Sequence, residues 1–377
     1  MKKTVFIAAL AVVAMASCTK NELKVPATGT DAVISFQPVV ANATKASYIT
    51  NTSIAPTGDP KSSTFKFKVY AWYTGELMAT TTTASTATKY MDAVEVSYKA
   101  GHNDTTEGQG GWSPDKTYYW PKNGYLSFDA YAPSAASSDG TFSSDVQKGL
   151  QITSYTVKDL NQQYDLLYSK RTLNKKNSTE GATNDTYDGV DIAFKHALAA
   201  IEVTAKTGAD YGNDAIKLQK ITILNAYNKG TFTQGMTNAA AEGTAAWSKP
   251  SNETTYELFK SVDGVALTTT ELSSTSDTNP ISNAILLPQG FSHDGGNKVS
   301  IRVDYTIKHG DAELAQYYIA DLSGTYDSMG GASPLQLSAW EIGKRYTYNF
   351  IFSLDEVYFA PSVDNWDDVT VDDITVK

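Results

Sequence analysis

Residues 299–308 read VSIRVDYTIK, in which every odd-numbered position is apolar or aromatic and every even-numbered position is polar. Successive side chains of a β-strand point to opposite faces, so this alternation puts one face in a core and the other in water. The five residues of the apolar face are β-branched or aromatic, which are the residue types that strands favour. The segment therefore predicts a half-buried strand.

The same period of two recurs along most of the chain. Other examples are FKFKVYAWY at 65–73, VEVSYK at 94–99 and YTYNFIFSL at 346–354. Turn-forming stretches such as GHND at 101–104 and HDGGN at 293–297 separate the strand candidates. Only residues 159–163 and 239–246 are candidates for short helices. We therefore predict an all-β fold with minor short helices.

A polar segment rich in Asn, Thr and Asp, residues 175–189, divides the strand candidates into two groups of about seven. This division predicts two tandem β-sandwich domains, at 32–185 and 186–377. The chain has one cysteine, so an internal disulfide is excluded, and apolar burial must hold each domain together. Hydrophobic residues make up 41% of the chain, which is enough for two cores.

The first 31 residues are predicted to lie outside the fold. Two lysines precede an apolar run at 5–14 that is too short to span a bilayer, so residues 1–17 are interpreted as a signal peptide. Cys18 follows directly, and the segment MASC at 15–18 resembles a bacterial lipobox. Cys18 is therefore either a lipidation site or a buried thiol, and its position favours lipidation. Residues 18–31 then form a flexible tether.

The composition argues against several classes of function. A formal net charge of −10 disfavours binding to nucleic acid. The four histidines are His102, His196, His293 and His309, and no HExxH, CxxC, GxSxG or phosphate-binding glycine loop occurs. His196 lies in an apolar strand pattern and is interpreted as a hydrogen-bonded core residue. We predict no enzymatic activity, no cofactor and no metal site.

Tyr70 and Trp72 lie on the face of their strand opposite Phe67 and Val69. Two roles remain open for this aromatic pair. It could stack on sugar rings, which would favour a surface glycan-binding lipoprotein of a nutrient-uptake system. It could also form a contact between domains or subunits.

Several short motifs, taken in their order along the chain, carry a family resemblance. They are ISF at 34–36, YYWP at 118–121, LSFDAYAP at 126–133, DLLY at 165–168, FKHALA at 194–199, LLPQ at 286–289 and WEIGKRYTY at 340–348. Together they resemble the fimbrillin family of pilus subunits from Bacteroides-type bacteria. The resemblance implies transthyretin-like sandwiches, export as an outer-membrane lipoprotein and a structural or adhesive role at the cell surface. The implied partners are other fimbrial subunits and a host or bacterial surface ligand.

The resemblance also implies a mode of assembly. A protease would cut behind the first strand, that strand would leave, and a strand of a neighbouring subunit would take its place. The candidate first strand is 33–40, with Ile34 and Phe36 on one face, and the candidate cleavage residue is Lys45, which could equally be an ordinary exposed lysine. Two segments near the carboxyl end are candidate donors unless they are strands of their own domain: 357–359, and 369–376 with apolar positions Val369, Val371, Ile374 and Val376.

Overall fold

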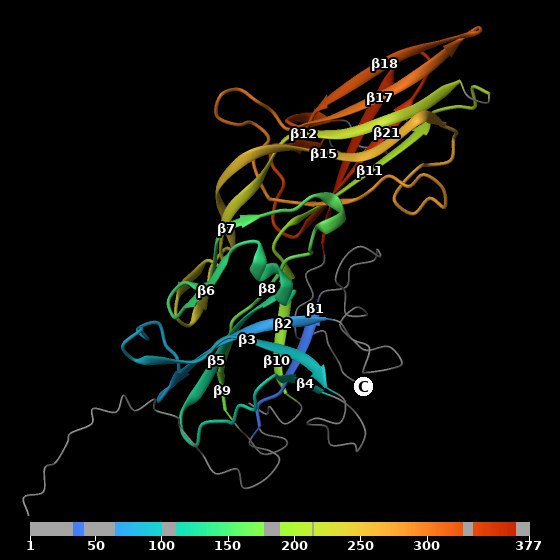
Figure 1. Cartoon of the computed structure of the whole chain (residues 1–377). Coiled ribbons are helices and arrows are strands. Elements are labelled where there is room, and N and C mark those ends of the chain that lie inside the picture. Colours follow the sequence, from blue (N-terminus) through green and yellow to red (C-terminus); the bar gives the residue numbers. More distant parts are fainter. Residues whose placement is uncertain are drawn as a thin grey trace, which may run out of the picture.

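The computed structural model describes residues 33–40, 65–99, 111–176, 189–212, 215–326 and 335–366. This part of the chain consists of strands in several sheets, with two short 3-10 helices, η3 (Ser134–Ser138) and η4 (Leu160–Gln162). The prediction of an all-β fold is confirmed. Figure 1 shows an elongated molecule, with β1 to β5 towards one end and β17, β18 and β21 towards the other.

One sheet, at the lower end in Figure 1, closes on itself. Its strand order is β2-β3-β4-β1-β10-β8-β5-β9, and β5 also pairs with β2, so the first seven strands form a ring. We call it the closed sheet. Its strands are β1 (Phe36–Val40), β2 (Lys66–Thr74), β3 (Ala87–Lys99), β4 (Gly111–Pro114), β5 (Tyr125–Ala132), β8 (Leu167–Ser169), β9 (Thr172–Lys175) and β10 (Val190–His196).

Two further sheets pack face to face as a sandwich. The four-stranded sheet has the order β16-β11-β21-β22, with β11 (Ala199–Thr207), β16 (Ala284–Leu286), β21 (Lys344–Phe352) and β22 (Val357–Asn365). The six-stranded sheet has the order β18-β17-β12-β7-β6, and β15 also pairs with β12. Its strands are β6 (Thr141–Asp145), β7 (Gly149–Thr156), β12 (Ile216–Thr233), β15 (Ala246–Ala266), β17 (Ser300–His309) and β18 (Ala312–Asp321). Edge-to-face rings join the two sheets, with Tyr305 and Phe352 centred 5.0 Å apart.

Strand β17 covers residues 300–308 of the alternating segment 299–308. Ile301 and Val303 are fully buried, and the intervening Arg302 and Asp304 form an ion pair on the outer face of the sheet. The predicted half-buried strand is confirmed. The side chains alternate because the pleat of a strand sends neighbours to opposite faces.

Two segments pair with strands that are distant in the sequence and belong to a different sheet from their sequence neighbours. The hairpin of β6 and β7 lies between strands of the closed sheet in sequence, yet β7 pairs with β12 of the six-stranded sheet. Conversely, β10 follows residue 186 but pairs with β1 and β8. The division into two domains at 185/186 stays a prediction, and a cut there would separate β10 from its partner strands.

One of the two short helices expected from the sequence is wrong. Residues 239–246 lie in and after a hairpin of β13 (Met236–Asn238) and β14 (Ala241–Glu242), where Ala240 N–H donates to Asn238 Oδ1 at 3.0 Å. Eight residues are too few for helical propensity to prevail over this pairing. The helix η4 falls within the other predicted segment, 159–163. A last pair of short strands is β19 (Gly324–Tyr326) and β20 (Leu335–Leu337).

Candidate functional site in the first strand

The first described strand lies in the core of the closed sheet. Ile34 is fully buried and Phe36 is 1% exposed. The Phe36 ring meets Phe128 edge to face at 5.7 Å and Phe67 at 6.1 Å. Burial of each such side chain contributes roughly 1.5–3 kcal/mol. The two residues named from the sequence therefore help to fill this core.

The backbone of β1 joins two strands that come much later in the sequence. It runs parallel to β10, from Phe36 opposite Val190 to Val40 opposite Phe194, and it meets β4 at one pair, Phe36 opposite Trp112. Just before this segment, Ile34 N–H donates to the Tyr118 carbonyl at 2.9 Å. Without β1, the ring of the closed sheet would be open between β4 and β10.

A glycine permits the close approach of β10 to β1. Gly189 has φ +113°, and a Cβ atom there would lie 3.0 Å from the Phe36 carbonyl carbon. Glycine adopts such positive φ values without steric cost, whereas other residues would clash. The start of β10 is therefore matched to the presence of β1.

The other residues singled out from the sequence have different outcomes. Cys18, Lys45, Val369, Val371, Ile374 and Val376 lie outside the described residues. The candidate donor segment 357–359 lies in β22, which pairs with β21 from Phe352 opposite Val357 to Lys344 opposite Asn365. In this structure it is a strand of its own sandwich.

His196 ties the end of β22 to the closed sheet. Its ring is buried, its Nδ1 lies 2.9 Å from Asp165 Oδ1, and it stacks on Trp366 with the ring centres 3.8 Å apart. The interpretation of His196 as a hydrogen-bonded core residue is confirmed. Trp366 is the last residue before 367–377, so this stack fixes the point from which the carboxyl-terminal segment begins.

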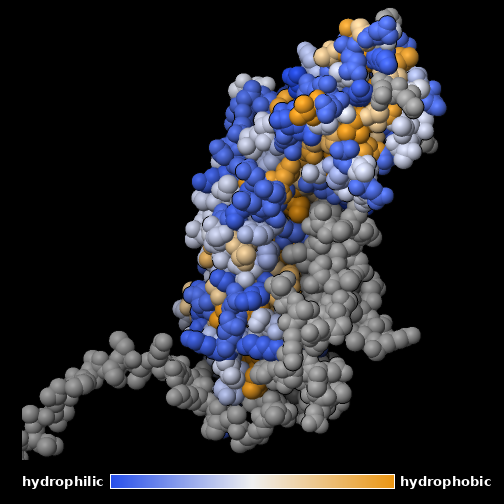
Figure 2. All heavy atoms as spheres, turned by 45° about the vertical axis from the view of Figure 1, so that its right-hand side comes forward, coloured by the Kyte–Doolittle hydropathy of each residue, from blue (hydrophilic) through white to orange (hydrophobic). Residues whose placement is uncertain are grey.

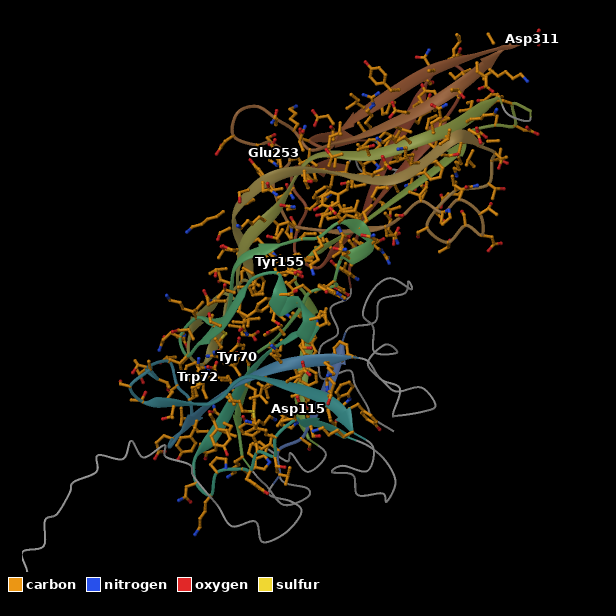
Figure 3. All side chains as sticks on the ribbon, viewed as in Figure 1. Tyr70, Trp72, Asp115, Tyr155, Glu253 and Asp311 are labelled. Atoms are coloured by element: carbon orange, nitrogen blue, oxygen red, sulfur yellow. The ribbon has the colours of Figure 1, made fainter. Side chains whose placement is uncertain are left out.

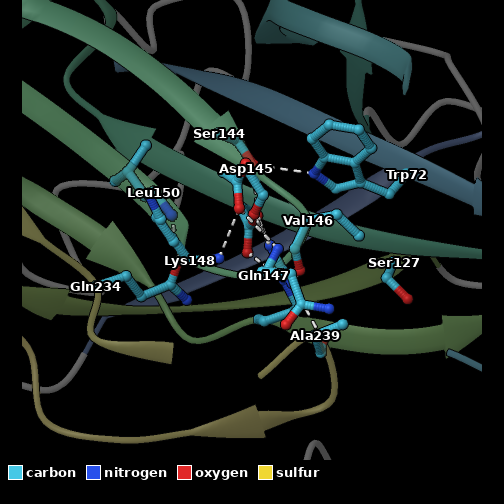
Figure 4. A network of polar contacts seen from close by, with 12 residues as sticks. Trp72, Ser127, Ser144, Asp145, Val146, Gln147, Lys148, Leu150, Gln234 and Ala239 are labelled. Atoms are coloured by element: carbon cyan, nitrogen blue, oxygen red, sulfur yellow. Dashed lines mark hydrogen bonds and ion pairs between the residues drawn. The ribbon is translucent and has the colours of Figure 1, made fainter. Parts of the chain in front are cut away.

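A buried ion pair joins the closed sheet to two hairpins. The side chains of Arg171 and Asp129 are fully buried, and Arg171 Nε donates to Asp129 Oδ1 at 2.8 Å. Arg171 also donates to the carbonyls of Val146, in the β6–β7 turn, and Ala239, in the β13–β14 turn, at 2.6 and 3.1 Å. Figure 4 shows this network, which we call the joint.

Further hydrogen bonds surround the joint. Ser144 Oγ donates to Asp129 at 2.7 Å and accepts from Trp72 Nε1 at 3.0 Å. The Gln234 amide accepts from Leu150 N–H at 2.7 Å and donates to the Ser169 carbonyl at 3.1 Å. Because its charged groups are paired and hydrogen-bonded, the joint avoids the large penalty of burying isolated charges. Sequence reasoning missed the joint, although a lone Asp within LSFDAYA at 126–132 was a usable signal.

The aromatic pair considered for sugar stacking is buried. Tyr70 is 1% exposed and packs near Tyr131, and Trp72 is 8% exposed. Figure 3 labels both residues, which come from β2. The reading of these two side chains as a sugar platform is therefore wrong, because other segments cover that face of β2.

The described residues contain no group of three or more His, Cys, Asp or Glu that could hold a metal ion. None of the helices in that part of the chain is long and apolar enough to cross a membrane.

The sequence profile of the family described as "Fimbrillin-like" matches residues 40–366, which is most of the chain and includes the sandwich, the joint and every strand of the closed sheet except β1, of which it includes only Val40. The chain belongs to the fimbrillin-like family. The resemblance noted from the sequence motifs is thereby confirmed. This family is structural and adhesive, so the prediction of a non-enzymatic protein is confirmed as well.

Two solved structures of fimbrial proteins are similar to this chain. A fimbrial protein from Bacteroides vulgatus is 16% identical with a TM-score of 0.54, and the match covers 89% of this chain and 100% of that one. The tip fimbrial protein Mfa3 from Porphyromonas gingivalis, with a C-terminal truncation, is 12% identical with a TM-score of 0.40, covering 79% and 94%. A search of curated proteins found no match. At 16% identity, the likeness to the Bacteroides vulgatus protein shows a shared fold alone.

Proposed function

We propose that this fimbrillin-like chain is a structural or adhesive pilus subunit at the cell surface, joined to other subunits by strand exchange. Family membership supports the fimbrial role, and the fold shared with a fimbrial protein of Bacteroides vulgatus agrees with it. Export would follow the lipoprotein route, with Cys18 as the lipid-carrying residue at the outer membrane. Several acyl chains on one residue would hold the chain firmly, since each buried methylene contributes about 0.8 kcal/mol.

The observation that carries the proposal is the place of β1 in the closed sheet. This strand is the only described one of the ring that precedes β2, and it closes the ring between β4 and β10. A strand near the end of a chain can leave without unthreading any other element. Its departure would uncover the Phe36 site and leave backbone groups of β10 unpaired.

An incoming strand would repair both defects. It would restore the ladder along β10 and refill the apolar positions, which is strand addition between subunits. The segment 369–376 is the candidate donor, because Val369, Val371, Ile374 and Val376 supply apolar side chains and Trp366 anchors its start. Four apolar side chains at roughly 1.5–3 kcal/mol each would make dissociation slow.

The test is limited digestion of the soluble Cys18→Ser chain with a lysine-specific protease. We expect a product that begins at Ala46, followed by oligomers that resist dilution, because the freed first strand is replaced by a neighbour's donor strand. Light scattering and amino-terminal sequencing measure the two outcomes. The Lys45→Gln variant is the matched control and should stay monomeric.

A cleaved chain that keeps its first strand and remains a monomer would remove the strand-exchange part of the proposal. The donor assignment has a separate test. A peptide of residues 367–377 should bind the cleaved chain, and the same peptide with Val371→Asp and Ile374→Asp should not. The burial of Tyr70 and Trp72 leaves glycan binding without the observation that motivated it.

A further inference from the structure

The outermost strand of the six-stranded sheet is an open edge. β18 pairs with β17 along its whole length, from Ser300 opposite Asp321 to His309 opposite Ala312, and no described strand pairs with its other side. Figure 3 places Asp311, in the turn between the two strands, at the far upper end of the molecule. The second row of amide and carbonyl groups on β18 therefore faces outward, where another strand can reach it.

This edge lacks the features that usually protect edges. Lysine, proline or a bulge commonly prevents association, but β18 reads AELAQYYIAD and its register with β17 has no bulge. Its two acids already have counter-ions within the subunit. Glu313 lies 2.7 Å from Lys217, and Asp321 lies 2.6 Å from Lys298.

Large apolar side chains stand exposed along the same strand. Leu314 is 50% exposed, Tyr317 is 61% exposed and Ile319 is 47% exposed. The Arg302 guanidinium lies 4.6 Å from the centre of the Tyr317 ring and holds that ring against the outer face. Figure 2 shows hydrophobic atoms at the surface in the upper part of the molecule, to which β17 and β18 belong. Three such residues on one unprotected edge indicate an interaction surface.

We propose that two copies of this chain pair through β18, antiparallel and about a two-fold axis, so that the six-stranded sheet continues across the interface. Such an axis stands perpendicular to the sheet and matches inner face with inner face, so residues of the same parity oppose each other. With Gln316 opposite its own copy, Leu314 faces Tyr318 and Ala315 faces Tyr317. Apolar cross-strand pairs of this kind stabilise a sheet.

The sequence of β18 selects this register and this partner. Moving the axis to Tyr317 would place Glu313 opposite Asp321 within the paired strands, and like charges directly opposite are destabilising. In the Gln316-centred pair, Asp321 at the end of β18 faces only Asp311, which lies in the turn outside the strand. The edge carries no uncompensated charge that would select an oppositely charged strand, whereas its own sequence supplies apolar partners in alternation. The contact lies on the sandwich, away from β1, and is independent of the proposed strand exchange.

Cysteine cross-linking tests the register in the full chain carrying Cys18→Ser. In the Gln316-centred pair, the two copies of residue 316 face each other with Cα atoms about 4.5–5.5 Å apart, a separation that a disulfide can bridge. The Gln316→Cys variant should form a disulfide-linked dimer on mild oxidation. Leu314→Cys, on the same face of the same strand, is the matched control and should remain unlinked. Equal cross-linking of both variants, or of neither, would overturn the proposal.

Sedimentation over a range of concentrations tests the contact without cysteines. We expect a transition from one chain to two. Tyr317→Lys, which brings two lysines near each other across the axis, and Ile319→Glu, which places a carboxylate opposite Glu313 of the other copy, should each raise the dissociation constant about tenfold or more. Both side chains are exposed, so the fold should survive, which circular dichroism checks. Val262→Lys, at a position 89% exposed on β15, is the control. A monomer at every concentration, or a dimer insensitive to Tyr317→Lys, would contradict the proposal.

Discussion

Single residues fix how the closed sheet meets the sandwich. Arg171 and Asp129 are both buried. Arg171 donates hydrogen bonds to Asp129 and to the Val146 carbonyl, and Asp129 also accepts one from Ser144. A buried ion pair of this kind adds little to stability relative to well-packed apolar residues, but loss of one partner leaves a charge with no counter-ion. The joint therefore acts mainly to specify one arrangement of the β6–β7 and β13–β14 turns around β5.

A double-mutant cycle tests this role. Arg171→Met should lower the free energy of unfolding by about 3–5 kcal/mol, because Asp129 then stays buried and unpaired. The double variant Arg171→Met/Asp129→Leu should lose less than the sum of the two single variants. Urea denaturation measures each value. Arg302→Met, in a partly exposed pair, should cost less than about 1 kcal/mol. Additive losses at the joint would contradict the expectation.

Buried tyrosines give the fold an alkaline limit. Burial raises the pKa of Tyr131 to about 12 and that of Tyr346 to about 12. In the unfolded chain tyrosine titrates near pH 10. Above that pH the unfolded state is stabilised relative to the folded state, because it loses protons that the folded state retains. This contribution to stability is therefore complete below about pH 10 and is lost as the pH rises towards 12.

The expected result is a fall in the free energy of unfolding between about pH 10 and 12, which is smaller in Tyr131→Phe. Chemical denaturation at a series of pH values measures it, and tyrosinate absorbance follows ionisation in parallel. Thr141→Ala, at an exposed position of β6 and without an ionisable group, is the control and should leave the slope unchanged. A flat profile across this range would contradict the assigned burial.

Among the strands, β1 combines deep burial with few backbone partners on one side. The Phe36 side chain fills the centre of the closed sheet, while the ladder of β1 with β4 consists of one pair. These two properties suit an element that must hold the sheet before assembly and still be replaceable by another strand. The open edge of β18 is a different case, since its backbone is already paired on one side along ten residues.

Truncation of the Phe36 side chain tests how much its burial contributes to stability. Phe36→Ala should lower the free energy of unfolding by about 3–5 kcal/mol, the usual cost of the cavity left by a buried phenylalanine. Thermal or urea denaturation measures the change. Thr141→Ala, at an exposed position of β6, should stay within about 0.5 kcal/mol of the parent. A small effect at Phe36 would mean that β1 is only loosely held.

At the scale of the whole molecule, the closed sheet and the sandwich depend on each other for stability, because β7 and β10 pair across the sequence division at 185/186. The core of the sandwich continues without interruption to Tyr70 and Tyr131 of the closed sheet. β7 and β10 each pair with strands of the part of the chain to which they do not belong in sequence. Unfolding of one end would thus expose apolar surface of the other.

We therefore expect a single cooperative transition in calorimetry of the soluble chain, with equal calorimetric and van't Hoff enthalpies. A fragment of residues 32–185 should fail to fold, because it lacks β10 and the β12 partner of β7. A fragment of residues 32–197 should be more ordered by circular dichroism, since it restores β10. Two separate transitions, or a stable 32–185 fragment, would contradict this coupling.

Local side-chain patterns are enough to locate the strands. The alternation at 299–308 and 65–73 gave all-β elements close to β17 and β2, and the apolar pattern at 33–40 placed a strand at β1, because side-chain period is a local property of the backbone. Ordered motifs also identified the family, and the absence of catalytic spacings agreed with it.

Tertiary structure alone decided which strands pair and which faces are covered. Phe36 lies between β4 and β10, Tyr70 and Trp72 are buried on the second face of β2, and Arg171 meets Asp129 across 42 positions of sequence. Pairing and burial depend on contacts between segments far apart in the chain, and no local period encodes them.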